Sequence, residues 1–119
     1  MTGQPARQAE TAAEAVRALN HATLPGTNEL TGPADVYDTL GALAILAARL
    51  PQALAQLQAF LDAQTDAGQI AVIDGEHAVD PAAAAATAGH WTDTATAATQ
   101  ALQHALKQAH TALTWTARA

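Results

Sequence analysis

The sequence predicts a mainly α fold: a four-helix bundle-like domain with one short β-hairpin before a long C-terminal helix. Thirty-four of the 119 residues are alanine, which has the highest helix propensity of all residues. Apolar residues recur at spacings of three and four along most of the chain. Proline and glycine gather in a few short stretches, which mark helix ends. We therefore expect a single helical domain over 1–119, with 1–5 disordered.

A loop rich in turn-forming residues separates the first two expected helices. The first helix is expected over about 6–22, with an apolar stripe of Ala9, Ala12, Val16 and Leu19. The loop "LPGTNELTG" ends at a helix start signal, because Pro33 suits the first helical turn and Asp35 is stabilised by the helix dipole. The second helix is expected over 33–50. It is apolar on nearly all sides, so we expect it to be central.

Pro51 is expected to end the second helix. Proline has no backbone N–H and clashes with the preceding turn, so the sequence predicts a break there and a third helix to about Ala67. Gly68 follows as a C-terminal stop.

The segment after Gly68 favours β structure. Ile70, Val72 and Ile73 are β-branched, and Asp74-Gly75 suits the turn of a tight hairpin. These residues predict a hairpin over about 70–79. A helix cap and a first-turn proline then open the last helix, which could extend to Arg118 with a break at Gly89.

Charge and hydropathy exclude several classes of partner. Five basic residues stand against eleven acidic ones, giving a formal net charge of -6, which repels phosphate backbones and anionic lipid surfaces. The longest apolar run, "GALAILAA", is shorter than the roughly 20 residues of a membrane span. The N-terminus lacks the apolar core of a signal peptide. We therefore expect a cytoplasmic protein that binds neither nucleic acid nor membranes.

The residues that usually carry chemistry do not form a recognisable site. The chain has no cysteine and no serine, and no two of its five histidines have metal-binding spacing on one helix face. Catalysis would have to rest on Tyr37, Asp38, Glu29 and His21 near the loop. The sequence therefore predicts no catalytic residues, no metal site and no cofactor, and it favours a protein that is not an enzyme.

Helices followed by a hairpin also fit a winged helix-turn-helix regulator. In that interpretation residues 51–67 would form the recognition helix. This segment has no lysine or arginine, although binding to DNA depends on cationic contacts with phosphates. Charge therefore disfavours this alternative.

The segment "TGPADVYDTLGAL", followed by "LPQAL", resembles short helical proteins of high-GC actinobacteria. The resemblance covers about the middle third of the chain. It implies a bacterial source and no particular activity.

We expect a helical protein–protein interaction module that forms a homodimer or a higher oligomer. Thin alanine-rich cores favour association, because a second copy supplies area to bury. Tryptophan is a preferred interface anchor. The candidate interface residues are Trp115, Ile45 and Leu113.

The main alternative is a helical bundle that binds a small molecule. Such a protein needs a pocket between helices. The candidate residues for this site are Asn28, Glu29, Tyr37, Asp38 and Trp91.

Overall fold

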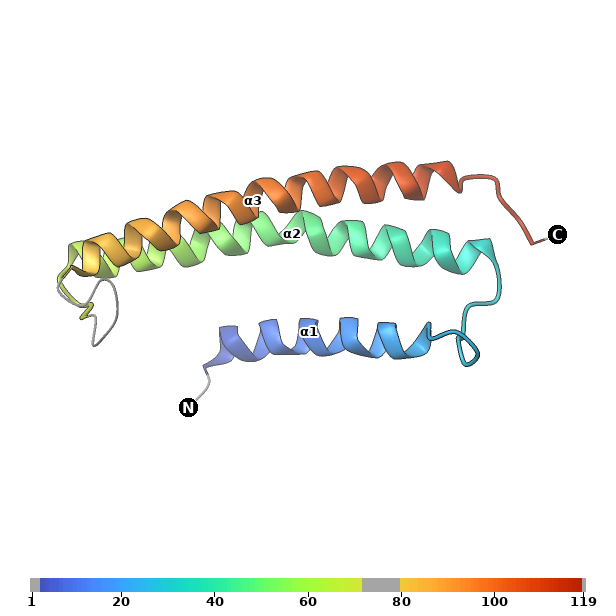
Figure 1. Cartoon of the computed structure of the whole chain (residues 1–119), viewed down its shortest axis with the longest axis horizontal. Helices are drawn as coiled ribbons and strands as arrows, with labels where there is room; N and C mark the ends of the chain where they lie inside the picture. The colour runs from blue at the N-terminus through green and yellow to red at the C-terminus, as the bar shows by residue number, and fades with distance from the viewer. Residues whose placement is uncertain (1–2, 72–79, 119) are drawn as a thin grey trace. The chain divides into compact units, whose positions relative to one another are not determined.

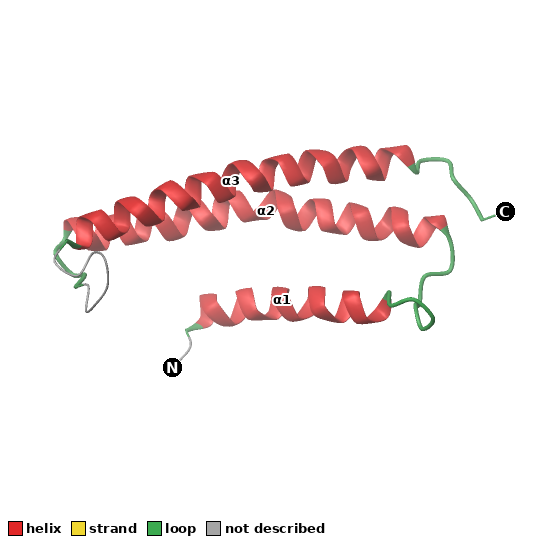
Figure 2. Cartoon of the chain, in the orientation of Figure 1, coloured by secondary structure: helices red, strands yellow, loops and turns green. Residues whose placement is uncertain are grey.

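The computed structural model describes residues 3–71 and 80–118. All regular secondary structure in these ranges is helical, and it comprises α1 (Gln4–Ala22), α2 (Pro33–Asp66) and α3 (Pro81–Ala112) (Figure 1, Figure 2). The mainly α fold class is confirmed. The chain divides into two compact units, Met1–Val36 with Trp115–Ala119, and Tyr37–Thr114.

The expectation of four helices is wrong, because the second and third expected helices form the single helix α2. Pro51 lies inside this helix. It removes one backbone hydrogen bond, but α2 packs against α3 on both sides of it, so continued packing outweighs the local cost. Residues 70 and 71 form no strand, and the rest of the expected hairpin, 72–79, lies outside the described residues.

Helix α3 passes through Gly89 without a break and ends at Ala112, earlier than Arg118. The backbone N–H of Leu113 donates to the carbonyl of His110, and that of Thr114 donates to Thr111, so the chain tightens into a turn here. Trp115 follows with a positive φ of 71°. That conformation ends a helix.

The ends of the helical hairpin are fixed by local capping. The Asp80 carboxylate accepts a hydrogen bond of 3.1 Å from the N–H of Ala83, as an N-cap does. At the end of α2, Gly68 has a φ of +70°. The N–H of Gln69 donates to the carbonyl of Gln64, and that of Gly68 to Thr65. This pair of bonds is a Schellman motif, so the expected stop at Gly68 is confirmed.

Helices α2 and α3 run antiparallel and pack side by side along one seam (Figure 1). From residue 44 to residue 63, every position of α2 is exposed except six that recur at spacings of three and four. These six residues are Ala44, Ala47, Pro51, Leu54, Gln58 and Leu61. An average period of 3.5 residues is typical of helices that pack along a coiled-coil seam.

Small side chains fill the centre of the seam. Among the described residues, only Ala44, Ala47, Ala85 and Thr99 are buried. The Thr99 hydroxyl donates to the carbonyl of Ala95 at 2.7 Å, so its burial leaves no donor unsatisfied. Small residues let two helices approach closely, but they bury little apolar area.

The loop before α2 is built from local hydrogen bonds. Residues 24–27 form a turn closed by the N–H of Thr27 and the carbonyl of Leu24, with Pro25 and Gly26 at its centre. Gly26 has a φ of +87°, which identifies a type II turn.

The start of α2 is anchored by Asp35. Thr31 donates both its hydroxyl and its backbone N–H to Asp35 Oδ2, each at 2.7 Å. Both bonds lower the pKa of the Asp35 carboxyl because they favour its ionised form, and the bond from the Thr31 hydroxyl has the larger effect.

We predict that Pro51→Ala stabilises the protein. Alanine restores the missing N–H and removes the clash, and proline is about 3 kcal/mol less favourable than alanine inside a helix. Loss of ring packing offsets part of this, so we expect the free energy of unfolding to rise by about 1–3 kcal/mol. Urea denaturation at a fixed protein concentration measures it.

Pro33→Ala is the matched control. Pro33 is the first residue of α2, where its missing N–H has no partner in the helix, so this change should alter stability little. Equal or lower stability of Pro51→Ala would indicate that two separate helices meet at this position.

Candidate functional site

Asn28 and Glu29 of the expected ligand site have structural roles in the loop. Asn28 Oδ1 accepts a hydrogen bond of 3.1 Å from the N–H of Leu30. The N–H of Glu29 donates to the carbonyl of Ala22 at 2.8 Å. Both contacts hold the chain in its turn, and they leave the Glu29 carboxylate exposed.

The structure does not bring Tyr37 and Trp91 together. The Tyr37 ring stacks on His110, with ring centroids 3.8 Å apart. Trp91 lies 19 residues before His110 on the same helix, a distance of about 28 Å along its axis. Trp91 is 63% exposed and contacts the edge of His90. Asp38 is also exposed.

A groove instead opens on one side of the α2–α3 seam, with a volume of about 390 Å³. Its floor is made of small residues, and its rim carries the only lysine of the chain. The lining residues are Gly41, Ala44, Ile45 and Ala48 from α2, and Gln103, Lys107 and His110 from α3. Its apolar floor and polar rim are typical of a shallow small-molecule site.

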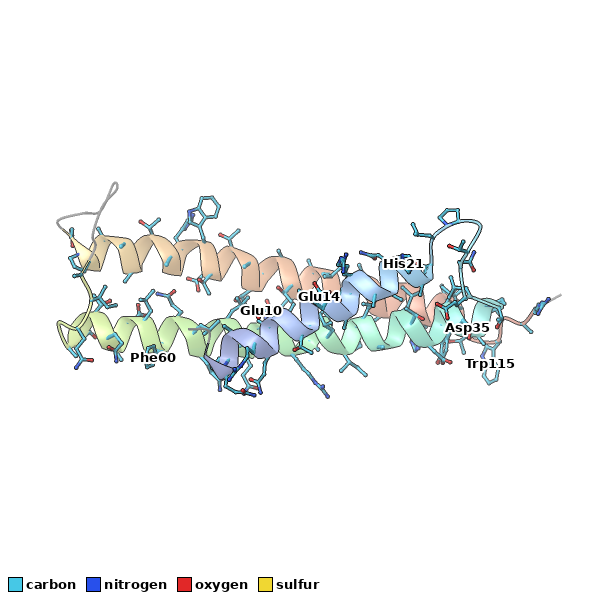
Figure 3. The ribbon with its side chains drawn as sticks, turned by 90° about the horizontal axis from the view of Figure 1, so that it is seen from below. Glu10, Glu14, His21, Asp35, Phe60 and Trp115 are labelled. Carbon is cyan, nitrogen blue, oxygen red and sulfur yellow. The ribbon has the colours of Figure 1, made fainter. Side chains whose placement is uncertain are left out.

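The three expected interface residues lie in different surroundings. Ile45 lines this groove and is 54% exposed. Leu113 caps the end of α3 and is partly buried. Trp115 lies beyond the end of α3, although the last helix was expected to extend to Arg118. Its side chain projects from the C-terminal segment and is 97% exposed (Figure 3).

A second apolar stripe on α2 is the feature that the sequence interpretation missed. It is displaced by about 100° around the helix from the seam, and its members also recur at spacings of three and four. They are Leu43, Leu46, Leu50, Ala53, Leu57 and Phe60. Leu57 and Phe60 are 62% and 67% exposed, and Phe60 projects from α2 on the side turned away from α3 (Figure 3). We call these six residues the outer stripe.

The outer stripe lies on the opposite side of the hairpin from the groove. Gly41 and Ala48 are displaced from the seam in one direction around α2, toward the groove, whereas Leu43 and Leu50 are displaced in the other. The same geometry on α3 places Gln103 and Lys107 on the groove side, and Leu102 and Trp91 on the side of the outer stripe. Leu102 is 50% exposed, so this side of the hairpin presents apolar residues from both helices.

A polar contact fixes the register between the two helices. Gln58 Nε2 donates to the carbonyl of Ala85 at 3.1 Å and to Asp62 Oδ1 at 2.9 Å. The Thr92 hydroxyl donates to Gln58 Oε1 at 3.4 Å. Gly89 makes room for this amide, since a methyl group at Gly89 would lie 3.2 Å from Gln58 Nε2. A single polar residue in a helix–helix seam is a known determinant of register.

Helix α2 has the length and the apolar composition that a membrane-spanning helix needs. Its most apolar window has a mean hydropathy of 1.4, and 11% of that window is buried. The core helix of a soluble protein can have the same length and composition, although such a helix is mostly buried, so the cytoplasmic location stays a prediction. Within 3–71 and 80–118, no three His, Asp or Glu side chains are grouped closely enough to hold a metal ion.

Comparison with models of protein families, with curated proteins and with solved structures found no match. Function is therefore inferred from the geometry of the chain.

We predict that Gln58 and Gly89 are energetically coupled. Alanine favours a helix over glycine by about 1 kcal/mol. In a Gln58→Ala background, Gly89→Ala should raise the free energy of unfolding by about this amount. When Gln58 is present, the new methyl group at position 89 would displace the Gln58 amide from the Ala85 carbonyl. Gly89→Ala should then raise the free energy of unfolding by less, or not at all.

A double-mutant cycle by urea denaturation at one protein concentration measures this coupling. An equal gain in both backgrounds would mean that Gln58 does not depend on the space at Gly89.

Proposed function

We propose that the chain is a non-enzymatic interaction module that associates with a second copy of itself. One observation carries this proposal: among the described residues the hairpin fully buries only alanine and threonine, while most of its large apolar side chains are exposed. Leu57, Phe60 and Trp91 are each more than 60% exposed. Exposed apolar surface of this kind, when contiguous, is typical of interfaces.

The composition of the outer stripe suits contact with an identical surface. None of its six residues is charged, although each chain has a net charge of -6. Two copies can therefore meet there without placing like charges in contact. The acidic residues Asp38 and Asp62 lie beyond the two ends of the stripe and on another side of α2, where they are exposed and can remain in water.

The geometry of the groove supports a second candidate, a small-molecule-binding helical protein. Lys107 supplies a cation at the rim of a groove whose apolar lining includes Ile45. This combination would suit a small molecule with an apolar body and a carboxylate.

We predict that the full chain sediments as twice its monomer mass of 12.1 kDa at micromolar concentrations. The variant Leu57→Glu should shift the protein toward the monomer, because it buries an unpaired charge in the interface. Ala59→Glu, on the exposed side of α2 turned away from both the seam and the outer stripe, is the matched control and should sediment as the wild type does. A wild-type monomer throughout this range would contradict the proposal.

For the small-molecule candidate, we predict that a carboxylate ligand found by thermal-shift screening raises the melting temperature by several degrees. The shift should disappear in Lys107→Met, which removes the cation and keeps the length of the side chain. Gln108→Met, one residue further along α3 and outside the groove lining, should leave the shift unchanged. An unaltered shift in Lys107→Met would place the ligand elsewhere.

A further inference from the structure

The length and spacing of the outer stripe limit how two copies of the chain could pack together. Its six residues extend over 17 residue steps, from Leu43 to Phe60, or about 26 Å along α2. They alternate steps of three and four throughout. Such a stripe can pack against an identical stripe over its full length.

We propose that α2 pairs with α2 of a second copy in antiparallel orientation, about a two-fold axis that passes beside Pro51 and Gln52. This inference rests on the self-association proposed above and adds the surface, the orientation and the register. Because this axis is perpendicular to the helices, the contact is reciprocal and each residue of the stripe pairs with a residue of different number in the other copy. Leu43 then pairs with Phe60, Leu46 with Leu57, and Leu50 with Ala53.

Only this antiparallel register pairs all six residues of the stripe with one another. A shift of one heptad in one direction places Leu57 against Thr39. A shift in the other direction places Leu46 against Gln64. Either shift exposes large apolar groups or buries a polar one, which costs free energy.

Side-chain volume favours the antiparallel orientation over a parallel one. In a parallel pair, Phe60 would meet Phe60 in one layer and Ala53 would meet Ala53 in another. The first layer would be crowded and the second would leave a gap. The antiparallel register pairs the large phenylalanine with a leucine, and the small alanine with Leu50. Antiparallel helix dipoles also attract one another.

Cysteine cross-linking tests this register directly, because the chain has no cysteine of its own. We would prepare Leu46→Cys and Leu57→Cys as separate full-length variants and oxidise them alone and as a mixture. Residue 57 of one copy would lie about 16 Å along the axis from residue 57 of the other, too far for a disulfide. Residue 46 would lie beside residue 57 of the other copy.

The expected result is a covalent heterodimer in the mixture as the main oxidised product, with little covalent dimer from either variant alone. Leu43→Cys mixed with Phe60→Cys should behave in the same way. The controls are Ala48→Cys and Ala55→Cys, which lie at the same height in this register but about 180° around α2 from the outer stripe, and should give no covalent dimer when mixed.

Three outcomes would overturn the inference. Efficient cross-linking of each variant alone would indicate a parallel pair. A dimer in sedimentation without any heterodimer cross-link would mean that self-association uses another surface, so the register fails while the proposed function stands. A monomer in sedimentation would overturn both, and it would indicate that another segment of the chain covers the outer stripe.

Discussion

The close approach of α2 and α3 through small residues is the constraint on which the other features of the hairpin depend. Alanine at the centre of the seam lets the helix backbones approach one another, and Gly89 makes room for the Gln58 amide at the point where it bonds across to α3. This arrangement defines the register well, but it buries little apolar area. The free energy gained from burial within the hairpin is correspondingly small.

The position of the large apolar side chains follows from the same constraint. Only two of the six seam residues of α2 are leucines, so most of the large apolar side chains lie on other faces of the helices. On α2, four leucines and Phe60 form the outer stripe together with Ala53, and this stripe has the same 3.5-residue period as the seam. Two stripes on one helix are typical of a helix that contacts more than one neighbour. The proposed second copy would supply such a neighbour.

The helical content, the start of α2 and the stop at Gly68 could be predicted from the sequence, because each depends on local chemistry. Pro51 was misleading, since the cost of a proline is local, whereas the packing that keeps α2 continuous comes from α3, distant in the sequence. That error also hid the outer stripe, whose phase can be recognised only when residues 43 and 60 are placed on one helix.

The candidate sites were harder to predict than the fold. Asn28 and Tyr37 suggested a ligand site because polar and aromatic residues lie close together in the sequence, but their side chains contact Leu30 and His110 instead. The groove at Lys107 could not be recognised, because it requires the antiparallel register of two helices. Trp115 was placed on the last helix because that helix was expected to extend to Arg118, whereas the turn at Leu113 ends the helix before it.

If the hairpin depends on a second copy for its stability, unfolding and dissociation are linked. The most direct measurement is the melting temperature of the unmodified chain, followed by circular dichroism at increasing protein concentration. We expect the melting temperature to rise steadily with concentration, as mass action requires for a folded dimer that unfolds to monomers. A melting temperature that does not change with concentration would show that the chain folds without a partner copy, and it would contradict the central role given to the outer stripe.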